Sequence, residues 1–233
     1  MRTLGLAVLA ASVFAGAATA HEAYVLAEPG GAYLVAWGHP GEAPGRYDVD
    51  EVLDVALHGA DGRALDARRL EADGQVRIEP ATRAEAAMAS FVFEPGATIQ
   101  TGEGRYVPGS KADHPGYLRA FHSVRSGKAL YAWSPAFAEP LGAELELVPL
   151  SDPFGAAQDL DLVLLYDGDP LAGAPVTVRQ DLEERELTTG PDGRISVSLA
   201  QRGETLIAAR HALPLDNEIV DERALSTVLT IAR

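Results

Sequence analysis

The sequence contains no cysteine among its 233 residues. No disulfide can therefore brace the fold, and no thiolate is available as a nucleophile or as a metal ligand. Histidine, carboxylate, amine and backbone groups are the ligands that remain for a metal ion.

The sequence also lacks the short motifs of common enzyme families. It holds no Gly-rich phosphate loop, no G-x-S-x-G elbow, no dinucleotide fingerprint and no H-E-x-x-H zinc motif. His21-Glu22 begins like the zinc motif, but Val25 stands where the second histidine would lie. Carboxylates are abundant, yet their order in the chain does not pair any two of them as acid and base.

Positive charge is scarce. The chain has 19 Lys and Arg residues against 34 Asp and Glu residues, and its formal net charge is −15. An acidic surface disfavours nucleic acid and anionic lipid and attracts cations. The same acidity also keeps an exported protein soluble, whatever that protein binds. The charge thus argues against a nucleic-acid partner without selecting a ligand.

The first 20 residues have the pattern of an export signal. Arg2 gives a short basic start, an apolar run rich in small residues follows, and Ala18-Thr19-Ala20 matches an A-x-A cleavage box. The apolar run has about 15 residues, fewer than the roughly 20 that a membrane-spanning helix needs. We therefore expect cleavage after Ala20, a periplasmic protein without a transmembrane segment, and His21 as its first residue.

Short runs that are apolar, or that alternate between apolar and polar residues, recur along the chain. They are AYVLAE, AYLVAW, VLDVALHG, QVRIEP, ASFVFEP, ELELVPL, LDLVLLYDG, PVTVRQ, RISVSL, TLIAARHA and LSTVLTIAR. Turn sequences such as GADG, DGDP and GPDG separate them. Many short strands punctuated in this way predict an all-β protein built from β-sandwiches. TRAEAAMA and the stretch around LRAFHSVRSGKAL are two weaker helical candidates.

A cluster of Pro, Gly and Asp residues between Pro149 and Gln158 indicates a domain boundary. We expect a signal peptide at 1–20, an N-terminal Ig-like β-sandwich at 21–150 and a C-terminal β-sandwich at 151–233. The C-terminal part contains a G-x-P-L-x-G-A-x-V hairpin followed by T-x-x-D-G-R. This pattern resembles the transthyretin-like or carboxypeptidase-regulatory β-sandwich, a module that seldom carries chemistry alone.

Three of the six histidines stand out as candidate metal ligands. His21, once it is the first residue, can chelate one ion through its α-amine and Nδ1 together. The reference pKa of an α-amine is about 8, so a late first-row metal can displace its proton at neutral pH. His39 and His211 each follow an apolar strand and precede a loop, where a side chain is held firmly but stays accessible. For His39 and His211 the pattern alone slightly favours loop histidines that merely end a strand over metal ligands.

The order of several motifs resembles the DUF4198 family, which includes the exported NikK-type accessory components of nickel and cobalt uptake systems. The motifs are His21-Glu22 after the signal, WGHPGEAPGRYDVDEVLDVALHGADGR, GRYVPGSK, GKALY, PLGAELELVPLSDPF, DGDPLAGAPVTV, GPDGR and His211 before STVLTI. Each motif is loose, and their order over nearly the whole mature chain carries the resemblance. It implies a periplasmic two-domain β protein that handles a transition metal beside an energy-coupling-factor permease or a TonB-dependent importer.

The resemblance implies three metal ligands, His21, His39 and His211. His122 is a fourth candidate, while His58 and His114 are expected to be solvent or turn residues. Four nitrogens, or three with an open position, form the planar or T-shaped arrangement that Cu(II) and Ni(II) favour.

An acid beside the site, such as Glu22 or Asp216, is a candidate to orient an imidazole. The resemblance implies Ni or Co as the ion, with Cu as the other option. Ligand type alone does not rank Ni, Co, Cu, Fe and Zn.

Three classes of function stay open at this point. The favoured one is a metal-binding, non-enzymatic accessory or delivery protein of an uptake system. The second is a copper enzyme, because a terminal histidine with another histidine also forms the brace of oxidative polysaccharide-cleaving monooxygenases. Such enzymes need aromatic residues on a flat face, and this chain has only two Trp, seven Tyr and six Phe. The third is a module that binds a non-metal ligand or a surface protein.

Overall fold

The computed structural model describes residues 21–82, 85–180, 183–215 and 217–233. The expected signal peptide at 1–20 and the candidate acid Asp216 lie outside the described residues. No helix among the described residues is long and apolar enough to cross a membrane.

The described chain is almost entirely β-structure, as the sequence predicts, and its strands form three sheets. The N-terminal sheet runs in the order β1 (Glu22–Ala27), β2 (Tyr33–Gly38), β5 (Gln75–Pro80) and β4 (Ala67–Ala72). The central sheet runs in the order β13 (Glu183–Thr188), β12 (Pro175–Gln180), β15 (Glu204–Pro214), β16 (Glu222–Ala232), β8 (Arg119–Leu130), β6 (Met88–Gln100) and β3 (Val52–His58), and β7 (Tyr106–Pro108) also pairs with β6. The C-terminal sheet consists of β11 (Asp169–Pro170), β10 (Asp159–Tyr166) and β14 (Arg194–Ser198), with β9 (Leu145–Pro149) on β10.

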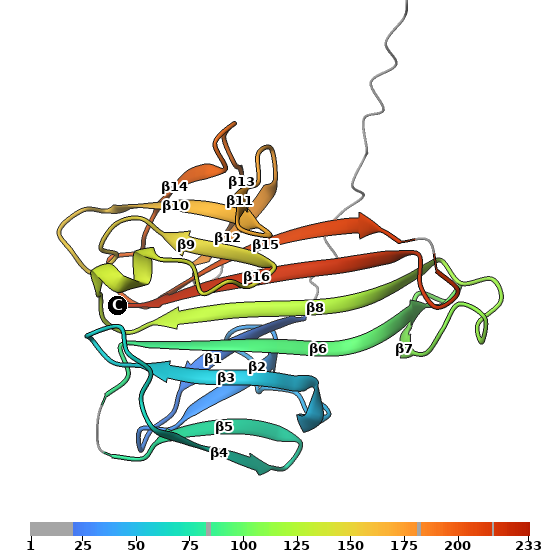
Figure 1. Cartoon of the computed structure of the whole chain (residues 1–233), viewed down its shortest axis with the longest axis horizontal. Helices are drawn as coiled ribbons and strands as arrows, with labels where there is room; N and C mark the ends of the chain where they lie inside the picture. Colours follow the sequence, from blue (N-terminus) through green and yellow to red (C-terminus); the bar gives the residue numbers. More distant parts are fainter. Residues whose placement is uncertain (1–20, 83–84, 181–182, 216) are drawn as a thin grey trace, which may run out of the picture.

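The three sheets form layers, with the central sheet between the other two (Figure 1). On one side, Leu147, Leu162 and Val197 of the C-terminal sheet pack against Ile207 and Leu229 of the central sheet. On the other side, the N-terminal sheet packs against the central sheet through two further apolar clusters. This sheet-on-sheet packing confirms the predicted sandwich architecture.

The central sheet crosses the boundary predicted at residue 150. β8 belongs to the first predicted domain and β16 to the second, and the two strands pair in parallel from Phe121 opposite Glu222 to Leu130 opposite Ile231. The ladder hydrogen bonds therefore join the two halves of the chain into one sheet, which both outer layers share. This long-range parallel pairing has no local signal in the sequence.

Neither helical candidate is a helix in the described residues. The stretch around LRAFHSVRSGKAL forms β8, whose neighbours β6 and β16 pair with it on both edges. Both faces of β8 are covered, so its apolar and small residues do not alternate cleanly and the strand period is hidden. In TRAEAAMA, residues 83–84 lie outside the described residues, and Met88 begins β6. The helical turns that the structure does describe are the short 3-10 segments η1 (Val49–Glu51) and η2 (Pro135–Ala138).

The β1–β2 hairpin is buried on both faces, which fixes its position. Val25 and Val35 pack with Phe91 of β6 on one face. Tyr24 and Leu34 pack with β15 and β16 on the other face. Because successive strand residues point to opposite sides, this alternation sets the register of the hairpin. The register ends with Glu22 opposite Gly38, and it thereby brings the residues just beyond, His21 and His39, to the same end of the hairpin.

Candidate metal site at the start of β1

The rings of His21 and His39 lie stacked on each other beyond the last pair of the β1–β2 hairpin. Their centroids are 4.8 Å apart and their planes differ by 27°. His21 is exposed and His39 is partly buried. Gly38, the last residue of β2, has φ +138°, a conformation that L side chains rarely adopt. The hairpin thus brings two imidazoles together at an accessible end of the fold.

The backbone of His39 is held by two donors. Its carbonyl oxygen accepts hydrogen bonds from the backbone N–H of Glu42 at 3.1 Å and from the Tyr24 hydroxyl at 3.3 Å. Burial, with Glu204 and Glu42 nearby, raises the pKa of Tyr24 to about 12. The hydroxyl therefore stays a donor at neutral pH. Neither contact uses the imidazole of His39, whose nitrogens make no hydrogen bond to the described residues.

His21 is held through its ring and its backbone. Its ring stacks on Trp37, with centroids 5.6 Å apart and planes 23° apart. Its carbonyl oxygen accepts a hydrogen bond of 3.2 Å from Nη1 of Arg125. The Arg125 guanidinium also lies over the Trp37 ring, 4.6 Å from its centroid. None of these contacts uses the ring nitrogens of His21, which have no hydrogen bond to the described part of the chain.

Glu22 lies beneath the site and is only 2% exposed. One of its carboxylate oxygens pairs with Arg210 of β15, and the other has no hydrogen-bond partner among the described residues. Glu22 was a candidate to orient an imidazole, but the partner that the structure gives it is Arg210. The ion pair instead attaches the first residue of β1 to the central sheet.

Arg125 supplies a partly buried cation next to the histidine pair. Burial lowers its pKa to about 10, while the nearby carboxylates of Glu22 and Glu51 raise it and Arg210 lowers it. The guanidinium consequently remains charged at neutral pH.

His211 does not join the other two predicted ligands. Arg210 and His211 are consecutive in β15, so their side chains point to opposite faces of the central sheet. Arg210 reaches Glu22 on the N-terminal side, whereas the His211 ring packs on Tyr166 of the C-terminal sheet at a centroid distance of 5.0 Å. The sequence placed His211 after its strand, where a loop begins, whereas β15 continues to Pro214, and the face on which His211 lies was not predicted either.

The remaining histidines have other partners. Nε2 of His122 lies 2.6 Å from Oε1 of Glu94, on the same face of the central sheet as His211. Nε2 of His58 lies 3.3 Å from the Ser90 hydroxyl, and burial lowers its pKa, so His58 is not the solvent residue that the sequence predicts. His114 lies in the loop after β7, as expected of a turn residue.

Sequence reasoning missed Trp37 and Arg125. Trp37 had a usable signal, because residues two apart in a strand share a face, and Trp37 precedes His39 by two positions. Arg125 had none, since it comes from β8, about 100 positions away in the sequence, and reaches His21 only through the packing of two sheets.

The described residues contain no cluster of three or more His, Asp or Glu side chains that is arranged to hold a metal ion. The histidine pair offers two imidazoles. An α-amine at residue 21 would exist only after cleavage and would add a third nitrogen to them.

The family model described as a domain of unknown function, DUF4198, matches residues 18–213. No curated protein matches the chain. Because the family match covers most of the 233 residues, the chain belongs to the DUF4198 family.

Proposed function

We propose that the mature protein is a periplasmic carrier of a late first-row transition metal ion, Ni or Co, with Cu as the other option. The observation that carries this proposal is the stacking of the His21 and His39 rings, 4.8 Å apart, at the residue that signal cleavage would make the first. Histidine rings packed together without hydrogen bonds from the protein to their nitrogens are suited to bind a cation.

The proposed ligand set has three nitrogens. The α-amine and the imidazole of His21 chelate the ion from one residue, and the His39 imidazole adds the third nitrogen. Since nitrogen ligands lie about 2 Å from such an ion, at least one of the two rings must turn from the stacked arrangement when it binds. His21 is exposed and its ring is not hydrogen-bonded, so this rotation breaks no hydrogen bond to the described residues. A fourth position stays open for water or for a ligand of the next carrier.

The accessibility of the site favours delivery over storage. His21 lies at the surface, and an ion held by three nitrogens with one open position can be transferred by ligand exchange. The NikK-type resemblance adds the proposed partner, an energy-coupling-factor permease or a TonB-dependent receptor system. In this role the ion is cargo and no chemical reaction is performed.

The same donor set forms the brace of copper monooxygenases, which makes oxidative chemistry the competing proposal. Those enzymes bind a polysaccharide on a flat aromatic face. In the described residues, Tyr106 is the one aromatic among the well-exposed large apolar side chains, and it lies on β7 rather than on the hairpin that carries His21. This distribution favours the carrier.

The test is metal binding by protein exported with its own signal. Mass spectrometry should give His21 as the first residue, and titration calorimetry should give one Ni, Co or Cu ion per chain. A variant with one extra residue before His21 should lose at least about a hundredfold in affinity, about 2.7 kcal/mol, because the α-amine becomes an amide. Equal affinity in the extended variant would contradict the proposal, and turnover of a polysaccharide by the copper form with reductant and oxygen would favour the enzyme.

A further inference from the structure

We propose that Arg125 is a positioning residue that holds the mature first residue in place, so that the α-amine and imidazole of His21 share one ion with His39. This inference rests on the proposed function, and it assigns a role in binding to a residue that does not itself touch the ion.

A first residue has little to hold it. After cleavage, His21 has no preceding peptide, and the β1–β2 pairing begins only at Glu22 opposite Gly38. Chain ends that are not tied down are poorly ordered. The His21 backbone has one hydrogen bond to a side chain, and its donor is Nη1 of Arg125. The carbonyl is two bonds from the α-amine, so fixing the carbonyl restricts where the amine can point.

Arg125 can hold His21 firmly because its own backbone is fixed on both sides. In the central sheet, Arg125 is paired with Phe93 of β6 and with Ser226 of β16. Its side chain crosses from this sheet to the N-terminal sheet, where the flat guanidinium lies over Trp37. Trp37 in turn stacks on the His21 ring. A single residue thus touches the backbone of His21 and also the ring that supports its imidazole.

The surroundings of Arg125 argue against a merely structural role. Its Nε is buried and has no hydrogen-bond partner among the described residues, and burial lowers the pKa of the guanidinium. Enclosing a charged group with one donor unsatisfied is costly. A methionine or leucine would fill the same space without that cost. What an apolar side chain would not supply is the hydrogen bond to His21 and a charge over the indole.

The chain offers a matched control. Arg223 of β16 also lies between sheets, where its Nε and Nη2 donate to the carboxylate of Glu144 at 2.6 to 3.0 Å. It sits on the opposite face of the central sheet from Arg125, so R223M removes a comparable interlayer arginine without reaching His21.

The experiment compares R125M, R125K and R223M with the unaltered mature protein, using Cu(II) or Ni(II) alone as the probe. We expect R125M to bind about 10- to 100-fold more weakly, the range seen when a residue that supports a metal ligand is lost. We expect R125K to restore only part of the affinity, because an ammonium lacks the planar fork that serves the carbonyl and the indole together. R223M should bind as the unaltered protein does.

Two spectroscopic readouts separate positioning from general destabilisation. The Cu(II) EPR spectrum of R125M should change in its hyperfine splitting, because the amine and the imidazoles no longer meet the ion in the same geometry. In metal-free protein, the NMR shifts of the His21 and His39 ring protons should move in R125M, and they should not move in R223M. If circular dichroism shows that R125M does not fold, R125K is compared with R223M and the unaltered protein by the same two spectra.

The inference is overturned if a folded R125M binds within about twofold of the unaltered protein with the same EPR spectrum. It is overturned equally if the ring protons of metal-free R125M do not shift. If the unaltered mature protein binds no metal, the proposed function fails on its own, and the ring-proton shifts still decide whether Arg125 positions His21.

Discussion

Histidines lie on both sides of the central sheet, but the protein holds them in different ways on the two sides. On the N-terminal side, His21 and His39 stack on each other, and the protein fixes their backbones while leaving their ring nitrogens without hydrogen bonds in the described structure. On the C-terminal side, His122 is bonded to Glu94 and His211 packs on Tyr166. This difference is why we propose the ion at the first pair, whose rings are brought together, and not at the second pair, whose members have separate partners.

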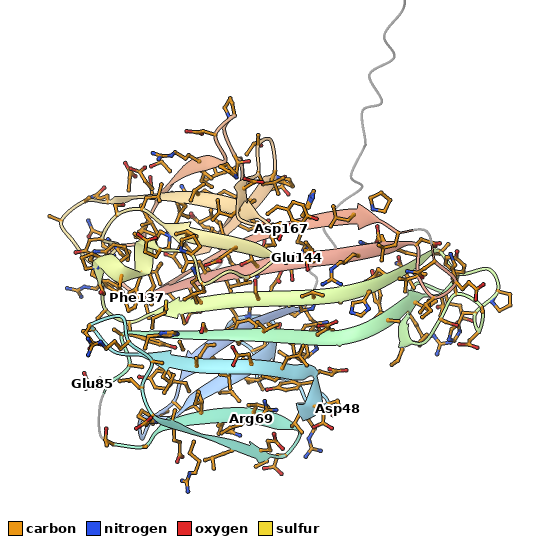
Figure 2. The ribbon with its side chains drawn as sticks, viewed as in Figure 1. Asp48, Arg69, Glu85, Phe137, Glu144 and Asp167 are labelled. Atoms are coloured by element: carbon orange, nitrogen blue, oxygen red, sulfur yellow. The ribbon has the colours of Figure 1, made fainter. Side chains whose placement is uncertain are left out.

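The C-terminal side also shows why many polar residues do not make a metal site. Arg223 is bonded to Glu144. Glu144 lies near Asp167, whose backbone N–H donates to the Glu144 carbonyl (Figure 2). In the sheet, Arg223 is opposite His122, and His211 lies on the strand beyond. Because β16 lies between β8 and β15, the two histidines are two strands apart, and His211 is also two residues out of line with Arg223. A guanidinium between them further disfavours a divalent cation.

The largest expected effect contrasts the two faces directly. H39A removes one of three proposed nitrogens and should lower metal affinity at least about a hundredfold, whereas H211A should leave it unchanged. Titration calorimetry with Ni(II) or Cu(II) on both variants measures the contrast. Equal losses of affinity in H39A and H211A would show that both histidines bind the ion. The contrast drawn between the two sides of the central sheet would then be wrong.

A second contrast concerns the ion pairs that attach each outer layer to the central sheet. Glu22 is buried, so E22A removes the partner of Arg210 and one of the two carboxylates near Arg125, and it should destabilise the fold by about 2 to 3 kcal/mol. Glu144 and Arg223 are each about 30% exposed in their side chains, and E144A should cost less than about 1 kcal/mol. Urea unfolding of the two variants gives both values. A smaller loss of stability for E22A than for E144A would show that the Glu144–Arg223 pair is the stronger attachment.

The hairpin that carries the site should also make the stability of the fold fall at alkaline pH. The pKa of Tyr24 is raised from 10 to about 12 by burial, so between these values the unfolded chain loses a proton that the folded chain keeps. Stability therefore falls as pH rises from 10 to 12, by about 2 kcal/mol from this residue, and it is unaffected below pH 9.

Y24F should remove that part of the pH dependence, while Y166F, on the other face, should not. Ultraviolet titration of tyrosinate with parallel urea unfolding at each pH tests this. A slope that persists unchanged in Y24F would assign the alkaline loss to other groups, such as Tyr131, whose pKa burial also raises.

The sequence predicted what depends on neighbouring residues. Alternating runs and Gly-rich turns were enough for an all-β sandwich protein. The family resemblance grouped His21 with His39, and the β1–β2 hairpin of the structure brings the two together. The parallel pairing of β8 with β16 was not predictable, because it joins residues about 100 positions apart and hides the strand period of β8. His211 was assigned to the wrong neighbourhood for a simpler reason: a shift of one residue along a strand changes the face, and nothing local distinguishes Arg210 from His211 as the residue that points towards β1.

The smallest expected effect tests whether His211 has a structural role instead. Its ring packs on Tyr166 at 5.0 Å, joining the end of β15 to the C-terminal sheet. Loss of one such contact costs about 0.5 to 1.5 kcal/mol, so H211A should unfold slightly earlier in urea at unchanged metal affinity. A double-mutant cycle with Y166A separates the contact from the general cost of each truncation. A coupling energy near zero would show that His211 has no role in packing. A loss of metal affinity in Y166A would show that the C-terminal face takes part in metal binding.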